Sequence, residues 1–358
     1  PSLMAGASAL LLHIDYESDQ GEDNLQNKLR PTGYFYAVLP FENDLNLNLS
    51  VNAPYGMITE WDNDWLESMM TTYTNLRCVY ITPSLAWKIN DQISIAGGIN
   101  LVTATARLAK NLPYPPKNKI YMSADAIGIG YTLSAMYKPH EDWNLGVHYQ
   151  SRVKLDFDGE AKYRKEGAFP VGYGYNTYFI EDDASTEITL PSSLGFGVAN
   201  SSFEKWTLSF DAVWTEWSTY ADNNITFESQ PGYIGATAPT KKWTSVKDKD
   251  WDDVWSFRFG ASYQLHENWV LRAGYMYDNS PDNDRHRSPE MPDSDRNMFA
   301  LGVGYSKDHW GFDFGYSYLI FKDSKAGSQA AGGSPDFKTS GKFETDLHVV
   351  SAAVKYTF

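Results

Sequence analysis

Several features on which other classes of protein depend are missing from this 358-residue sequence. It has one cysteine, Cys78, which excludes an intramolecular disulfide framework and a cysteine metal cluster. No run of about 18 apolar residues occurs, so a membrane-spanning helix is not expected. Basic residues are scarce: 30 Lys and Arg against 45 Asp and Glu give a net charge of −15, which disfavours a nucleic-acid partner.

Signs of catalysis and of metal binding are also missing. None of the seven histidines stands in a recognisable catalytic motif with a nucleophile. The acidic stretch "SPDNDRHRSPEMPDSD" lacks the glycine and the terminal glutamate of a calcium loop at the required spacing. The sequence therefore predicts no enzyme, no metal site and no cofactor.

Aromatic residues are abundant, with 24 Tyr, 18 Phe and 12 Trp, and they occur in segments where apolar and polar residues alternate. In "HWGFDFGYSYLIF" one face carries Trp310, Phe312, Phe314, Tyr316 and Tyr318. A period of two is typical of a strand. The pattern recurs in "KWTLSFDAVW", "VWSFRFGASYQL" and "WNLGVHYQSRVKLDF", and in the last of these the apolar face includes Val153, Leu155 and Phe157.

The polar face of these segments favours a membrane barrel over a soluble β-sandwich. A sandwich exposes Lys, Glu and Thr, whereas here the polar face is rich in Gly and Ser with isolated charges. The apolar face begins or ends on Trp or Tyr, as expected of aromatic residues at a lipid interface. A mean hydropathy of −0.45 agrees, because a barrel hides its apolar face at every second residue.

About fourteen such segments follow one another in the chain. They lie near 5–17, 31–41, 44–60, 72–89, 92–110, 122–138, 142–160, 184–200, 203–228, 250–266, 268–280, 295–306, 308–323 and 341–358. Tight turns such as "KPHED" and "LHEN" alternate with long polar loops. We therefore predict one domain over 1–358, an all-β, 14-stranded antiparallel transmembrane β-barrel whose long loops face outward.

Five stretches resemble the FadL/TodX family of outer-membrane transporters of long-chain fatty acids and hydrocarbons. They are "RPTGYFYAVLPFENDLNLNLSVNAPYGMITEW", "YQSRVKLDFDG", "TLPSSLGFGVAN", "AVWTEWSTY" and "AGYMYDNSPDNDRHRSPEMPDSDRN". The resemblance implies a monomeric barrel in the outer membrane of a Gram-negative bacterium. It further implies passive uptake of hydrophobic molecules and their lateral release into the membrane. The segment "PSLMAGAS" resembles the link to the family's N-terminal hatch, so the hatch is expected before Pro1, outside this chain.

The third predicted strand contains "SVNAPYGM", which is expected to interrupt strand pairing. Pro54 lacks the amide hydrogen that a ladder needs, and Gly56 weakens the strand further. One interpretation is a bulge or a strand end at the rim. The other is a kink that opens a lateral window at Asn52, Pro54 and Gly56; of these, Gly56 matches the family's kink glycine in position.

A carboxylate in an apolar lumen needs a cation, and the sequence offers one candidate. By strand parity Asn100 and Lys110 point inward, and Lys110 matches the position of a basic headgroup-binding residue in the family. A solvated lysine near a loop is the alternative interpretation. The family's second basic residue is replaced by Asn223 and Asn224, which leaves room for a neutral hydrocarbon. We predict Lys110, Asn100 and Asn224 as substrate-binding residues.

Charges of both signs are also predicted to point into the lumen. The candidates are Arg152, Lys154, Asp211, Arg258, Arg272 and Asp313. Because buried charges are normally paired, these residues are expected to form a network that braces the wall. Guidance of a substrate is the alternative role.

The final segment, "LHVVSAAVKYTF", alternates to its last residue and is expected to pair with the first strand. Phe358 resembles the terminal aromatic residue by which the barrel-assembly machinery recognises outer-membrane barrels. Membrane lipid and lipopolysaccharide are the other expected partners. The competing hypothesis for function is a general diffusion porin for small polar solutes, which normally has stronger opposed charge rows than this sequence offers.

Overall fold

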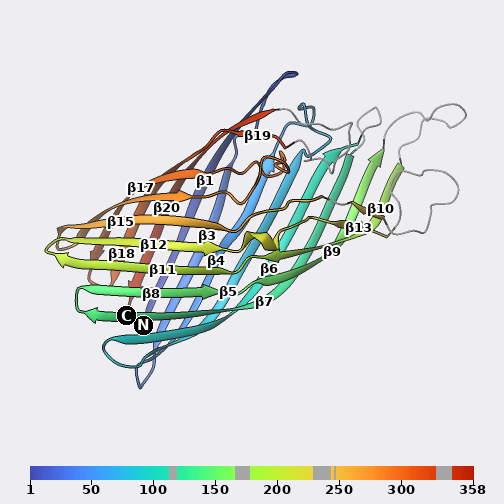
Figure 1. Cartoon of the computed structure of the whole chain (residues 1–358). Coiled ribbons are helices and arrows are strands. Elements are labelled where there is room, and N and C mark those ends of the chain that lie inside the picture. The colour runs from blue at the N-terminus through green and yellow to red at the C-terminus, as the bar shows by residue number, and fades with distance from the viewer. Residues whose placement is uncertain (113–118, 166–177, 229–242, 246, 328–340) are drawn as a thin grey trace, which may run out of the picture.

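A computed structural model describes residues 1–112, 119–165, 178–228, 243–245, 247–327 and 341–358. The chain forms a closed antiparallel β-barrel of 14 strands, which confirms the predicted fold. Figure 1 shows tilted strands with both termini at one end, here called the turn end; the described connection over residues 279–295 lies at the other end, here called the loop end. Among the described residues no helix is long and apolar enough to cross a membrane.

Ten wall strands are continuous, and four are split into two pieces. The continuous ones are β1 (Ser2–Ser18), β3 (Leu29–Pro40), β4 (Leu45–Glu60), β5 (Tyr73–Lys88), β6 (Ile93–Asn111), β7 (Lys119–His140), β16 (Trp269–Asp278), β17 (Arg296–Lys307), β18 (Trp310–Phe321) and β20 (Lys342–Thr357). The split ones are β8 (Trp143–Gln150) with β9 (Val153–Lys165), β10 (Tyr178–Leu190) with β11 (Ser193–Phe203), β12 (Trp206–Thr215) with β13 (Ile225–Phe227), and β14 (Trp243–Ser245) with β15 (Val254–His266). Short β2 (Gly21–Asn24), β19 (Ser324–Lys325) and the 3-10 turn η1 (Trp217–Thr219) complete the elements.

The barrel closes where the chain begins and ends. β1 pairs with β20 from Ser2 opposite Thr357 to Glu17 opposite Lys342, and on its other side it pairs with β3. The regular C-terminal segment therefore removes the last open edge of the sheet, which is otherwise a site for aggregation.

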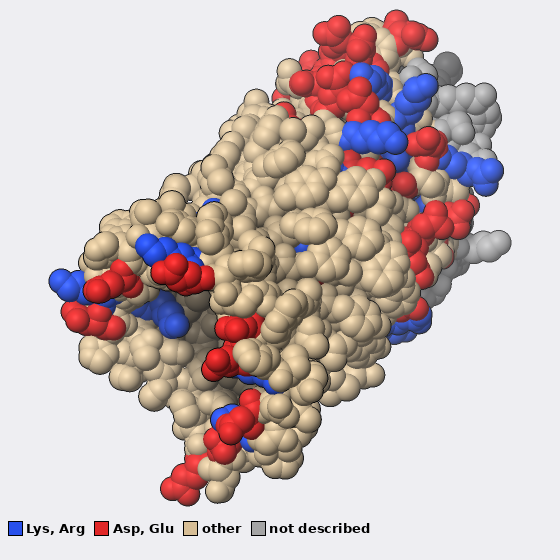
Figure 2. Space-filling view, turned by 60° about the vertical axis from the view of Figure 1, so that its left-hand side comes forward, with Lys and Arg blue, Asp and Glu red and all other residues tan. Residues whose placement is uncertain are grey.

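The outer wall between the two ends is apolar. Large side chains such as Ile127, Ile129 and Leu301 are 77%, 68% and 67% exposed, which fits contact with lipid and not with water. Figure 2 shows the charged residues gathered at the two ends of the molecule with a mostly uncharged band between them. The alternation predicted from the sequence thus assigns the lipid-facing side correctly over most of the wall.

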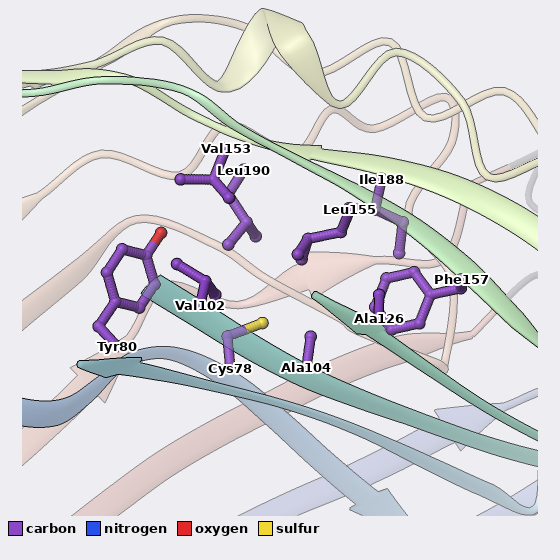
Figure 3. Packing of buried hydrophobic residues seen from close by; sticks show 10 residues of the cluster. All are labelled: Cys78, Tyr80, Val102, Ala104, Ala126, Val153, Leu155, Phe157, Ile188 and Leu190. Carbon is purple, nitrogen blue, oxygen red and sulfur yellow. The ribbon is translucent and has the colours of Figure 1, made fainter. Parts of the chain in front are cut away.

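One part of the predicted outer face was assigned wrongly. Val153, Leu155 and Phe157 were expected to face lipid, but they are buried and pack on the lumen side of β5, β6 and β7 (Figure 3). The chain steps inward after Gln150: β8 pairs with β7 near the turn end, whereas β9 pairs with β7 only from Asp158 onward. Residues 153–157 of β9 and 186–190 of β10 therefore form a second layer inside the wall, here called the inner layer.

Glycines of β7 make this close approach possible. A Cβ placed on Gly128 would lie 2.5 Å from Cγ1 of Val153 and 2.6 Å from the Lys154 carbonyl oxygen. A Cβ on Gly130 would lie 2.7 Å from Cγ2 of Val153. The inner layer packs on the backbone of β7 directly, and its apolar residues meet Cys78, Tyr80, Val102, Ala104 and Ala126.

Candidate functional site

The loop over residues 279–295 folds into the mouth of the barrel at the loop end. Thr59 Oγ1 and Trp61 Nε1 donate hydrogen bonds of 3.0 and 3.2 Å to the carbonyl oxygens of Glu290 and Pro289. Trp61 stacks on Trp65 with ring centroids 4.1 Å apart. These contacts fasten the loop to the end of β4 and to the segment that follows it.

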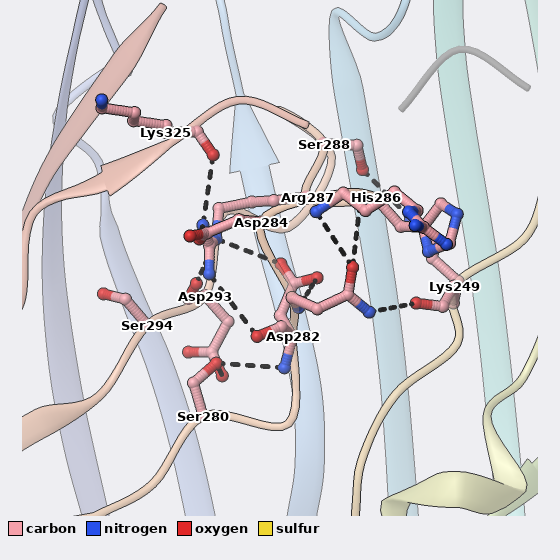
Figure 4. A network of polar contacts seen from close by, with 12 residues as sticks. Lys249, Ser280, Asp282, Asp284, His286, Arg287, Ser288, Asp293, Ser294 and Lys325 are labelled. Atoms are coloured by element: carbon pink, nitrogen blue, oxygen red, sulfur yellow. Dashed lines mark hydrogen bonds and ion pairs between the residues drawn. The ribbon is translucent and has the colours of Figure 1, made fainter. Parts of the chain in front are cut away.

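Arg287 organises the interior of this loop, as Figure 4 shows. Its guanidinium donates to the carbonyl oxygens of Asp293 and Lys325 at 2.7 and 3.1 Å and to the Asp284 carboxylate at 2.6 Å. Its Nε also lies 3.5 Å from the carboxylate of Asp282. Burial raises the pKa of the Asp282 carboxyl to about 6, although Arg287 and Lys249 act in the opposite direction.

A small cavity of about 150 Å³ lies between the wall and this loop. Most of its lining is apolar: Met70, Leu108, Leu112, Ile120, Met122, Ile225 and Phe227. Three charged side chains, Lys110, Lys247 and Glu290, also line it, together with the polar Thr71, Asn223 and Ser245. The combination of an apolar wall with a few convergent polar groups is typical of a ligand site.

Positive charge exceeds negative charge around this cavity. Glu290 forms an ion pair with Lys247 and lies 3.4 Å from Lys249 Nζ. Burial alone raises the pKa of the Glu290 carboxyl, but the two ammonium groups outweigh burial and bring it to about 2. Lys110 forms no ion pair among the residues that the structure describes. Two ammonium groups, Lys110 and Lys247, and one carboxylate, Glu290, therefore line the cavity, and an added anion would restore balance.

The three predicted substrate-binding residues do not meet in one place. Lys110 lines the small cavity. Asn224 lines a separate polar cavity of about 600 Å³ beside the inner layer. Asn100 is buried and accepts a hydrogen bond of 2.8 Å from Thr82 Oγ1. Lys247 and Glu290 were not predicted from the sequence, since both stand in irregular loops where no periodicity assigns a direction to a side chain.

The wall is interrupted between β3 and β4. These strands pair from Pro40 opposite Asn46 to Phe35 opposite Val51. Farther toward the loop end, residues 29–34 pair only with β1, and residues 52–60 pair only with β5. The stretch between residues 29–34 and 52–59 is here called the β3–β4 seam.

The seam lies at the depth of the apolar band and is bounded at both ends. Its β3 side pairs with β1 between Gly6 and Leu11, where the outward side chains of β1 are apolar. At the loop end, the carboxylate of Glu60 joins Lys28 and Arg30 at 2.5 and 2.9 Å. The seam is therefore an unpaired stretch within the membrane-facing wall and not a frayed rim.

The predicted window residues stand along the β4 side of this seam. Asn52 lies opposite Tyr80 and Tyr55 opposite Cys78, so β4 has one extra residue between them, a bulge that contains Pro54. A proline is tolerated there because the ladder is already interrupted. A Cβ on Gly56 would lie 3.3 Å from the Leu76 carbonyl oxygen, which is a tight contact with β5.

The predicted lumen charges form separate groups. Arg272 and Asp313 form an ion pair of 2.6 Å. Arg152 pairs with Glu216, and Lys154 lies 2.8 Å from Glu187. Asp211 and Arg258 are opposite each other in register but form no ion pair in the described part of the chain.

Comparison with known proteins places the chain among outer-membrane transport proteins. The "Long-chain fatty acid transport protein" of Escherichia coli O6:H1 is 22% identical over 96% of this chain and 82% of its own length. A Pseudomonas aeruginosa FadL homologue superposes with a TM-score of 0.83 at 19% identity, covering 99% of this chain and 90% of that one. The Pseudomonas putida toluene transporter TodX gives a TM-score of 0.78 at 14% identity, with coverages of 100% and 90%.

These two structures share the fold of this chain. The decisive match is to a family model, described as "Outer membrane protein transport protein (OMPP1/FadL/TodX)", over residues 6–358. That family consists of transport channels and not of enzymes. The chain belongs to the OMPP1/FadL/TodX family of outer-membrane transport proteins.

Proposed function

We propose that this protein takes up hydrophobic molecules with a carboxylate end and releases them sideways into the membrane through the β3–β4 seam. The observation that carries the proposal is the seam itself, an unpaired stretch at the depth of the apolar band. Closed barrels otherwise pair every strand, because unpaired backbone groups in a membrane are costly. The transport is passive, since binding depends on apolar burial worth about 0.8 kcal/mol per methylene.

The small cavity supports a carboxylate at the polar end of the substrate. Lys110 and Lys247 lie in a largely apolar lining, and Glu290 alone does not balance them. The volume of about 150 Å³ suits a headgroup and the first part of a chain. The rest of the molecule would extend toward the lumen, where the inner layer narrows the path.

The headgroup assignment is tested by binding measurements on single-lysine variants. Lys110→Met and Lys247→Met are each expected to weaken binding of oleate about 10- to 100-fold, since hydrogen bonds to charged groups are worth about 1.5–3 kcal/mol. Binding of toluene, which has no carboxylate, is expected to stay unchanged. Lys205→Met, at the turn end, is the control. Equal losses for both ligands would contradict a headgroup role.

The lateral exit is tested separately by closing the seam. Pro54→Thr restores a backbone amide donor to β4, and Gly33→Trp places a bulky side chain on the β3 edge. Both are expected to abolish uptake of oleate or toluene while the barrel stays folded. Ala37→Trp, on a part of β3 that is paired on both sides, and Pro83→Thr, where β5 pairs with β4 but not with β6, are the controls. Unchanged uptake by folded seam variants would show that substrates leave by another route.

A further inference from the structure

Two histidines and an aspartate meet on the outer face of the barrel where its first and last strands join. His13 lies on β1 opposite Asp346 of β20, and His348 follows two residues later on β20. The neighbours Ile14 and Phe343 pack in a buried cluster on the lumen side. Because side chains alternate along a strand, the three polar residues project from the outer side.

Their potential ligand atoms converge on one point. His13 Nδ1 lies 3.1 Å from Asp346 Oδ1, and His348 Nε2 lies 3.3 Å from the same oxygen. All three ligand atoms lie within 4.8 Å of one another. Two ligands of a tetrahedral Zn²⁺ site, each about 2.1 Å from the ion, are roughly 3.4 Å apart. Small side-chain rotations are therefore enough to place one ion between them.

The second ring nitrogen of His348 is held by a neighbouring strand. Its Nδ1 lies 2.7 Å from Tyr316 Oη, and its ring stacks on Tyr318 with centroids 4.6 Å apart. Metal-binding histidines almost always form such a bond through the other nitrogen, which fixes the ring and its tautomer. In the tautomer that donates to Tyr316, the lone pair of Nε2 points toward the Asp346 carboxylate, and a cation between them removes the repulsion.

The surroundings also favour a cation. Toward the loop end the next outward pair is Asp15 opposite Glu344, and toward the turn end the outward residues of β1 and β20 are apolar. The nearby Lys342 is already bound to Asp323 and Glu344, at 2.8 and 2.5 Å. The three residues thus lie where the apolar band ends, next to carboxylates.

We propose that His13, Asp346 and His348 bind one divalent transition-metal ion of the Zn²⁺ class on the outer surface of the barrel. Two imidazoles and one carboxylate suit Zn²⁺, Ni²⁺ or Cu²⁺, whereas Ca²⁺ and Mg²⁺ take oxygen ligands. The ion joins β1 to β20 through residues 333 positions apart and so stabilises the strand pair that closes the barrel. A remaining coordination position faces outward, toward water or a lipid phosphate.

The test is metal binding by the purified full chain in detergent. We expect one equivalent of Zn²⁺ by equilibrium dialysis, and a Co²⁺ absorption spectrum typical of tetrahedral nitrogen and oxygen ligands. His13→Gln and Asp346→Asn are expected to lose the bound equivalent, and Tyr316→Phe to weaken binding about 10- to 100-fold. His140→Gln is the matched control, because His140 pairs with Asp142 at 3.4 Å and the described residues offer no third ligand there.

A second measurement uses only the unaltered chain, so it does not depend on whether the variants fold. For the unaltered chain, Zn²⁺ is expected to raise the midpoint of thermal unfolding, and a chelator to reverse the shift. The proposal is overturned if the unaltered chain binds no more Zn²⁺ than the His13→Gln variant. It is also overturned if the site takes inorganic phosphate with protonated histidines and no metal.

Discussion

Arg272 of β16 reaches Asp313 of β18 across the whole width of β17, with 2.6 Å between Nη1 and Oδ1. In register, Arg272 lies opposite Gly302 and Asp313 lies opposite Gly304. A Cβ on Gly304 would lie 2.7 Å from Asp313 Oδ1 and 2.8 Å from Arg272 Nη1. The ion pair therefore exists because the intervening strand has no side chain at this point.

Gly304→Val is expected to break this ion pair and to lower the free energy of unfolding by about 1–3 kcal/mol, mostly through overpacking. The electrostatic part is small because both side chains are more than one-third exposed. Urea-induced unfolding measures the change. Gly315→Ala is the control, since its Cβ would meet no atom closer than 3.7 Å. Equal effects of both substitutions would contradict the explanation.

The inner layer predicts a second glycine effect. Gly128→Val is expected to push β9 away from β7 and to destabilise the barrel by about 1–3 kcal/mol or more, because the new side chain meets the backbone of residue 154. Gly146→Val on β8 is the matched control, as no heavy atom lies within 4 Å of its Cβ position. Thermal unfolding of the two variants compares them; a stable Gly128→Val barrel would argue against the inner layer.

Trp61 is predicted to hold the 279–295 loop in the mouth. Trp61→Phe keeps an aromatic ring beside Trp65 but loses the bond to the Pro289 carbonyl, at an expected cost of about 1–3 kcal/mol. Trp61→Ala also loses the packing, with an expected cost of about 3–5 kcal/mol. Hydrogen exchange of the loop amides measures local opening. Trp206→Phe, at the turn end, is expected to leave this exchange unchanged.

The same loop is predicted to be most stable in mild acid. The Asp282 pKa of about 6 exceeds the value near 3.9 of an unfolded aspartate, so the folded loop gains stability as the pH falls from about 7 to 4. The Glu290 pKa of about 2 lies below its ordinary value, so its ion pairs are lost as the pH falls from about 4.5 toward 2.

Hydrogen exchange of the loop amides, corrected for the dependence of the intrinsic exchange rate on pH, measures how the stability of the loop changes with pH. We expect the strongest protection between about pH 4 and 5, where Asp282 is protonated and Glu290 is still charged. Asp282→Asn is expected to remove the gain between pH 7 and 5, and Glu290→Gln to remove the loss in stronger acid. A flat profile for the unaltered chain would contradict both pKa assignments.

The strand segments and most of their faces were predictable from the sequence because strand alternation is a local property. Successive side chains point to opposite faces of a strand, so Trp310 and Phe312 face outward whereas Gly311 and Asp313 face inward. The closing strand was predictable too, since its alternation continues to the end of the chain. Pro54 and Gly56 indicated where pairing would fail, although only the register shows that β3 and β4 separate there.

The tertiary structure alone decided which distant residues meet. Alternation places Val153 and Leu155 on the apolar side of their strand, but it does not say whether that side meets lipid or the inner surface of the wall. They pack against the inner surface because the chain steps inward after Gln150. Lys247 and Glu290 come together from two loops, and His13 meets His348 only because the ends of the chain pair. A local pattern determines the direction of a side chain, whereas barrel closure and loop packing determine its partners.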